Sequence, residues 1–281
     1  MMLATARSGV ARGGIELRQT LTTWSDLFSY IFPTILLLSA IFFMRNSHVP
    51  GTNFSLGTQT LPSSFGMGLA FGGLMTVAQL LITDREDGTL MRAKATPNGM
   101  TGYLIGKVVT VGGMLLVSFL LQLIPGVFLV HGLHVSATGW LTLIWLVPLG
   151  LIATMPIGAV FGSLFESSRN MALIILPILA LVAISGVFYP ITALPGWLQA
   201  VGQCSPIYWL GLGMRSVFLP SSLAAVELGH SWRHWEVLGM LAFWAVLGLL
   251  LAPTFLRRMA RRESGSAVEA RRQRAMVAMG R

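Results

Sequence analysis

DREDGTLMRAKATPNGMTGYLIGK, residues 84–107, separates two long apolar segments in a chain that otherwise carries little charge. Five of its first nine residues are acidic or basic, so this part belongs in water at the end of a membrane span. Thr89 is predicted to cap a short helix over 90–95, because its hydroxyl can accept a free N–H of the first turn. Thr96-Pro97 ends that helix, since proline disfavours helical geometry in the residue before it. We therefore predict a short helix across the ends of two spans; the alternative is a charged loop that only fixes topology.

Composition identifies a membrane protein. Of the 281 residues, 54% are hydrophobic and 10% are charged, and the mean hydropathy is +0.73. Soluble domains carry about 25% charged residues. The length suits one bundle of spans, so we predict a single membrane domain over residues 1–281. Cys204 is the only cysteine, which excludes an internal disulfide and a thiolate metal cluster.

Six apolar segments are long enough to cross a bilayer, which predicts an all-α membrane protein with six transmembrane helices. Residues 1–26 mix apolar side chains with arginines and have no long apolar core. That composition favours an N-terminal helix in the membrane interface over a cleaved signal peptide. The polar residues 45–62 are interpreted as a loop. The predicted spans cover residues 27–44, 65–82, 104–130, 140–164, 171–188 and 235–256.

The distribution of basic residues predicts the orientation of the spans. Six spans place both termini on one side, and 16 of the 19 lysines and arginines lie on that side. The positive-inside rule makes this side cytoplasmic, together with the short helix at 90–95. The basic tail at 257–281 is expected to bind anionic lipid headgroups. No nucleic-acid partner is expected.

The same stretch resembles the signature of the type 2 ABC transporter permeases, E-R-E-x-G-T followed by T-P and G-K. Here the first position is Asp84, which keeps the charge of the commoner glutamate. In that family the short helix is a cytoplasmic coupling helix that docks on a separate ABC ATPase subunit. The resemblance therefore implies a set of coupling residues: Asp84, Arg85, Glu86, Gly88, Thr89, Leu90, Met91, Arg92, Thr96 and Pro97.

A second informative stretch, SGVFYPITALPGWLQAVGQCSP at residues 185–206, precedes the last predicted span. Its prolines and tryptophans favour short helices dipping into the outer leaflet, and surface helices in an aromatic belt are the alternative. The stretch is similar to the S-G-x-x-x-P and L-P-x-W pattern of the same permeases, which have an outer re-entrant helix pair that caps the exit. The outer-gate residues that this implies are Gly186, Pro190, Pro195, Trp197 and Pro206.

The chain lacks the motifs of a motor or of a hydrolase. Neither of its two lysines completes the phosphate-binding loop G-x-x-x-x-G-K-[ST], so ATP and Mg are expected in a partner subunit and no cofactor in this chain. It also lacks H-E-x-x-H and G-x-S-x-G, so no metal or catalytic residue is expected. A proton-driven secondary multidrug exporter is the alternative function. Such carriers place an acidic residue within the membrane, whereas Asp26, Asp84, Glu166 and Glu236 lie at predicted span ends.

The resemblance implies the permease subunit of an ATP-driven exporter in a bacterial plasma membrane. The family includes drug and antibiotic efflux permeases of the daunorubicin/doxorubicin type, as well as lipid exporters. Two copies, or this chain and a related permease, would pair with two ATPase subunits. Spans without charge favour a hydrophobic or amphipathic substrate: a drug, an antibiotic or a lipid.

Overall fold

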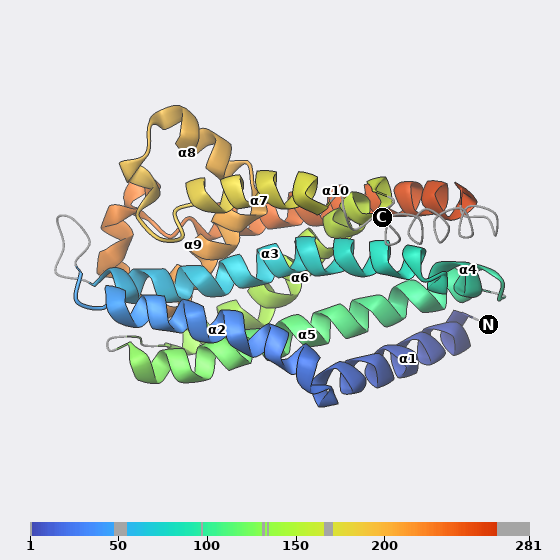
Figure 1. The fold of residues 1–281 in the computed structure, drawn as a ribbon. Coiled ribbons are helices and arrows are strands. Elements are labelled where there is room, and N and C mark those ends of the chain that lie inside the picture. Colours follow the sequence, from blue (N-terminus) through green and yellow to red (C-terminus); the bar gives the residue numbers. More distant parts are fainter. Residues whose placement is uncertain are drawn as a thin grey trace, which may run out of the picture.

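The structure is a computed structural model, and it describes residues 2–47, 55–96, 98–130, 133, 135–165 and 171–262. Over these ranges the regular structure is helical, without a β-strand. Long helices lie side by side, and the N-terminus, α4 and the last turn of α10 share one end of the bundle (Figure 1). The helices are α1 (Met2–Thr22), α2 (Trp24–Met44), α3 (Leu56–Glu86), α4 (Thr89–Lys94), α5 (Gly99–Leu129), α6 (Ala137–Leu164), α7 (Ala172–Ile184), α8 (Gly196–Gln203), α9 (Pro206–Phe218) and α10 (His234–Arg262), with 3-10 helices at Ile191–Ala193, Ser221–Val226 and Leu228–His230.

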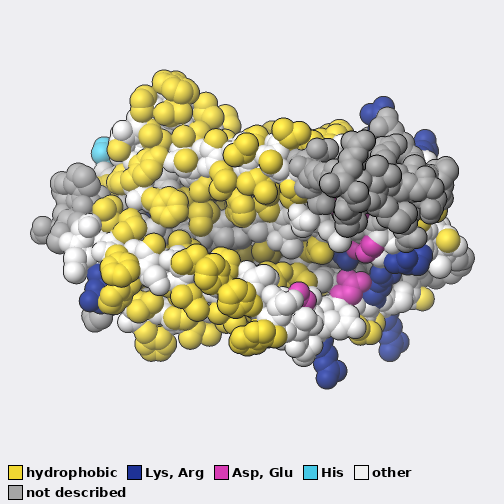
Figure 2. All heavy atoms as spheres, in the orientation of Figure 1, with side chains coloured by type: hydrophobic (Ala, Val, Ile, Leu, Met, Phe, Trp, Pro, Cys, Tyr) yellow, Lys and Arg dark blue, Asp and Glu magenta, His cyan; other side chains and the backbone are white. Residues whose placement is uncertain are grey.

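Five helices (α2, α3, α5, α6 and α10) have the length and apolar composition to cross a membrane. Hydrophobic side chains cover most of the face shown in Figure 2, and charged side chains gather near the end that carries α1 and α4. The prediction of an all-helical, multi-pass membrane protein is therefore confirmed at this level.

The predicted fifth span over residues 171–188 is not confirmed at full length. Its helix, α7, has 13 residues and ends at Ile184. Two residues later Gly186 has a φ of +63°, a left-handed conformation that stops the helix. At about 1.5 Å per residue α7 is about 20 Å long, short of the roughly 30 Å hydrocarbon layer.

The predicted loop over residues 45–62 is wrong at its C-terminal end, because α3 already begins at Leu56. The Ser55 side chain accepts a hydrogen bond from the Thr58 N–H at 3.0 Å and caps the helix. The first two turns are polar but buried, with Gln59 2% and Ser63 0% exposed. Buried polar residues lower the hydropathy of a helix without changing its geometry, which is why this part resembled a loop.

The centre of the bundle is α3, which packs against α5, α6 and α9. Glycines allow two of these contacts to be close. A Cβ added at Gly66 would lie 2.5 Å from the backbone of Leu210 and Gly211 in α9, and one at Gly158 in α6 would lie 2.5 Å from the carbonyl oxygen of Leu74. These crossings bring backbones together as small residues do in membrane helix pairs.

The N-terminal segment forms one helix, α1, which packs along the first half of α5. Gly9 and Gly13 lie against the backbone of α5, where an added Cβ would meet the carbonyl oxygens of Gly102 and Gly106 at 2.7 and 2.4 Å. The helix is thus tied to the bundle. Its placement in the membrane interface stays a prediction.

Candidate functional site

The charged stretch that follows α3 is divided between buried and exposed residues. Asp84 and Arg85 lie in the last turn of α3 and are 7% and 3% exposed. The Tyr103 hydroxyl donates to Asp84 Oδ2 at 2.5 Å, and the Lys107 ammonium lies 3.0 Å from the same oxygen. Arg85 Nη1 donates to the carbonyl oxygen of Phe165, just after α6, at 2.8 Å. These two residues therefore fasten α3 to α5 and α6, inside the chain.

The Lys107 ammonium also lies 3.2 Å from Glu16 Oε2, and Glu16 Oε1 lies 3.0 Å from Arg12 Nε. Charges of alternating sign thus link α1, α5 and α3. Burial raises the pKa of Glu16, but the hydrogen bond from Arg12 and the positive charge of Lys107 outweigh it, so the net pKa lies below the ordinary value. Because the pKa of Glu16 is lower in the folded protein, its ion pairs stabilise the fold at a pH above the ordinary carboxyl pKa. This stabilisation is lost as the pH falls through the lowered pKa.

The short predicted helix exists as α4, and the predicted cap is wrong by one residue. Gly88, with a φ of +78°, is the residue that precedes the helix, and Thr89 lies inside it. The Thr89 N–H donates to Asp87 Oδ1 at 2.8 Å, so the carboxylate satisfies the first turn in place of the Thr89 hydroxyl. Glycine adopts this left-handed conformation without the steric cost of a Cβ, so the turn from α3 into α4 favours glycine at this position.

The two faces of α4 differ. Leu90 and Ala93 are 1% and 6% exposed and pack into the chain, so Leu90 anchors the helix. Arg92 is exposed and donates from Nη2 to the Thr89 hydroxyl at 2.8 Å, and Met91 is half-buried. The exposed Lys94 donates to the carbonyl oxygen of Ala260 in α10 at 2.8 Å. The surface open to a partner is therefore the face with Met91 and Arg92.

Two of the remaining predicted coupling residues, Glu86 and Thr96, lie just before and just after α4 in the chain. Glu86 is half-buried, and Thr96 is exposed and ends the helix by donating from its hydroxyl to the Ala93 carbonyl oxygen at 3.0 Å. Pro97 lies outside the described residues. In the part of the chain that the structure describes, no group of three histidine, cysteine, aspartate or glutamate residues could hold a metal ion.

The Asp84 carboxylate is buried and the Asp87 carboxylate is exposed, and this difference allows a test. Asp84→Asn keeps an acceptor for Tyr103 but removes the charge beside Lys107, so we expect a loss of about 1 kcal/mol in the free energy of unfolding. Asp87→Asn changes an exposed carboxylate and retains an acceptor for the Thr89 N–H, so we expect no measurable loss. Denaturant unfolding in detergent would compare the two. Equal stabilities would show that the Asp84 contacts contribute little.

The outer-gate residues lie near the opposite end of the bundle from α4, around α8 (Figure 1). Gly186 is buried at the turn after α7, and Pro206 begins the buried helix α9. Pro195 precedes α8 and is exposed, as is Trp197 in its first turn, at 68%. Pro190, which is half-buried, precedes a 3-10 helix. The structure thus groups these residues on one short helical connection before α10, and their role as a gate stays a prediction.

Two charged residues of this region were missed in the sequence. Arg215 in α9 and Glu227, before α10, have side chains 1% exposed, and Arg215 Nε lies 2.7 Å from Glu227 Oε1. Arg215 Nη1 also donates to the Ser63 hydroxyl at 2.8 Å and to the Gly186 carbonyl oxygen at 3.2 Å. One guanidinium therefore joins α3, α9, the turn after α7 and the segment before α10. The available signal was a single arginine within the otherwise apolar residues 206–219.

Two further buried polar side chains lie on α3, one turn before Ser63. The side-chain amide of Gln59 and the hydroxyl of Thr60 are buried and lack hydrogen-bond partners among the described residues. Such groups are rare in folded proteins, because each costs the free energy of its lost hydration. The first turns of α3 therefore carry unsatisfied polar groups within an apolar protein.

A family model described as "ABC-2 family transporter protein" matches residues 45–252, a range that includes both signature stretches, α4 and the Arg215–Glu227 pair. No curated protein matches the chain.

Proposed function

Because this chain belongs to the ABC-2 transporter family and is a membrane permease component of an ABC transporter, we propose that it exports a hydrophobic or amphipathic substrate with the energy of a separate ATPase subunit. The substrate class proposed is a drug, an antibiotic or a lipid. The observation that carries the proposal is α4, a short helix held at one end of the bundle with Met91 and Arg92 facing outward.

The contacts around α4 suggest how a movement of the ATPase would reach the spans. Leu90 and Ala93 fix the helix on the bundle, and Lys94 holds the last turn of α10. Immediately before α4, Asp84 holds α5 and Arg85 holds the end of α6. A displacement of α4 therefore acts on four spans (α3, α5, α6 and α10) at the same end.

At the other end, α9 is the element that would respond. It is buried against α3, α6 and α10, and Arg215 ties it to Ser63 and Gly186. Gln59 and Thr60 lie one turn before Ser63, which contacts Arg215 of α9, so they share that face of α3. We expect a separation of α3 from α9 to give their unsatisfied side chains access to water. We propose that this separation opens the exit, with the α4 end in the cytoplasm. The permease works as a homodimer or with a related permease.

The proposal predicts a strong effect of charge on α4. In the Met91→Asp/Arg92→Asp variant, two carboxylates stand on the surface that meets the ATPase, and we expect association to weaken at least tenfold, about 1.4 kcal/mol. The variant should fold, because neither residue is buried. Arg258→Asp is the matched control, since it reverses an exposed charge at the same end of the bundle on α10. Co-purification of the ATPase subunit with each variant is the measurement.

Transport in sealed vesicles completes this test. Efflux of an amphipathic dye should require ATP and should be lost in the α4 variant but not in the control. Equal recovery of the ATPase with both variants would exclude α4 as the docking helix. Efflux that persists without ATP and follows a proton gradient would instead support the secondary carrier.

A further inference from the structure

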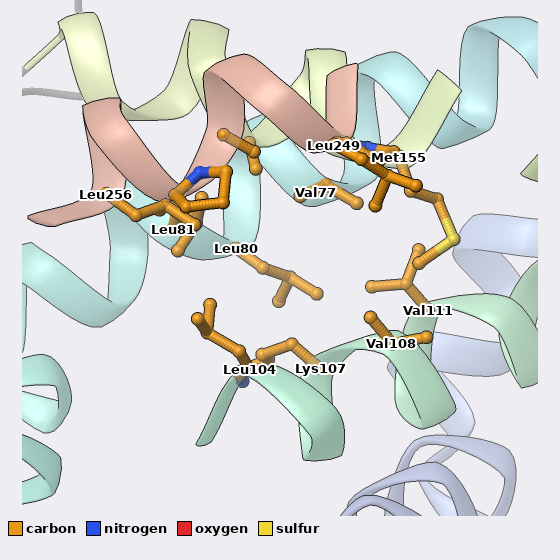
Figure 3. A pocket seen from close by; sticks show the side chains of 14 residues that line it. Val77, Leu80, Leu81, Leu104, Lys107, Val108, Val111, Met155, Leu249 and Leu256 are labelled. Carbon is orange, nitrogen blue, oxygen red and sulfur yellow. The ribbon is translucent and has the colours of Figure 1, made fainter. Parts of the chain in front are cut away.

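A groove between α5 and α10 has α3 and α6 as its floor, and we call it the α5–α10 groove (Figure 3). It encloses about 240 Å³. Its lining is apolar except for Lys107, and it includes Leu80, Val108, Pro156, Leu249 and Leu256. The Lys107 ammonium forms ion pairs with Asp84 and Glu16, which neutralise its charge. The aliphatic part of the Lys107 side chain lines the groove. The groove is therefore a hydrophobic site.

The groove opens on a surface that lipid covers. Val108 on one wall is 59% exposed and Leu249 on the other is 55% exposed, both on helices that can cross the membrane. Water is a poor occupant of an apolar groove, because it finds no hydrogen-bond partners there. If the groove stayed empty, its lining side chains would lose favourable dispersion contacts. Lipid tails are as apolar as leucine side chains, so an acyl chain fits this lining.

Basic side chains stand at one end of the groove. Leu256 is the last lining residue of α10, and the exposed Arg257 follows it, one turn after the lining residue Pro253. The ammonium of Lys94 lies 2.8 Å from the Ala260 carbonyl oxygen at the same end of α10. Residues four apart share a helix face, so Arg257 lies on the side of Pro253, whereas Arg258 is turned away. Positive charge at the end of an apolar groove complements a lipid with an anionic headgroup.

We propose that the α5–α10 groove binds one acyl chain of an anionic phospholipid, whose phosphate is held by Arg257. A second copy of the chain is a poorer occupant. A two-fold interface centred on this groove would bring Arg257 close to Arg257 of the second copy, and these like charges repel. The lipid would be a resident one, and the proposal does not depend on which substrate is exported.

Native mass spectrometry of the full chain in detergent tests the proposal, with phosphatidylglycerol and phosphatidylcholine as probes. We expect one phosphatidylglycerol per chain to be retained and phosphatidylcholine to be released. Arg257→Gln should weaken retention about fivefold, the effect of one basic residue near a lipid surface. Arg258→Gln, on the other side of α10, should leave it unchanged.

A second pair of variants tests the groove itself. Ala252, a buried lining residue, is replaced by phenylalanine to fill the cavity, which should lower retention at least tenfold. Leu250→Phe, at a position 68% exposed on the same helix, is the control and should retain the lipid. Equal retention of both lipids by the wild type, or equal loss in Arg257→Gln and Arg258→Gln, would overturn the proposal. A disulfide between two Val108→Cys/Cys204→Ser chains would assign the groove to a second copy and also overturn it.

Discussion

Arg215→Met is expected to lower the free energy of unfolding by about 3–5 kcal/mol, because it leaves the Glu227 carboxylate buried without its partner. Both side chains are 1% exposed, and the arginine also holds Ser63 and the Gly186 carbonyl oxygen. The measurement is denaturant unfolding in detergent, followed by tryptophan fluorescence.

The double variant Arg215→Met/Glu227→Leu should recover much of this loss, since a buried ion pair and an apolar pair of similar volume are often close in stability. Glu236→Gln is the control for an exposed pair: Glu236 lies 3.4 Å from Arg233 and its side chain is 50% exposed. We expect its effect to be below about 1 kcal/mol. A loss in Arg215→Met no larger than that of the control would mean that water reaches the buried pair.

Gly66→Ala is expected to destabilise the protein by about 1–3 kcal/mol through overpacking. The added methyl group would lie 2.5 Å from the backbone nitrogen of Gly211, and backbone cannot move aside as a side chain can. The two helices, α3 and α9, must then separate. Gly112→Ala in α5 is the matched control, because nothing lies within 4 Å of its added Cβ. There the better helix propensity of alanine should leave stability unchanged or raise it by up to about 1 kcal/mol. The same unfolding measurement applies, and equal effects of the two substitutions would exclude a tight crossing at Gly66.

The helices that face lipid were predictable from the sequence, because hydropathy reports contact with lipid. The helices α2, α5 and α10 are largely exposed to lipid along their apolar windows, and each was predicted to within six residues of its observed bounds. The short helix α4 was predictable for another reason: charge, a glycine and a proline all punctuate the chain there. The sequence of this stretch does not show which of its residues are buried. Asp84 in α3 and Leu90 in α4 are buried because other helices, α5 and α10 among them, pack around them.

The interior was less predictable, because it is held by contacts between distant segments. Ser63 and Arg215 are 152 positions apart, and each looks like a residue in water when its own segment is considered alone. The predicted loop over residues 45–62 extends into the first turns of α3, because buried polar side chains such as Gln59 and Ser63 lower the hydropathy of that segment. Arg215 is the single charge within the otherwise apolar residues 206–219. This isolated charge was the signal in the sequence that could have indicated a buried polar contact.

The shortness of α7 has a consequence for the bilayer itself. The 13 residues of this helix span about 20 Å, and its outward side chains include Leu173 and Leu176, which are 63% and 65% exposed. A hydrocarbon layer of about 30 Å beside such a helix must thin locally or draw headgroups inward, at a cost of fractions of a kcal/mol per ångström. The bilayer next to α7 would then be thinner than beside the five longer helices. By ending α7, the turn at Gly186 would thus favour a thinner bilayer beside this helix.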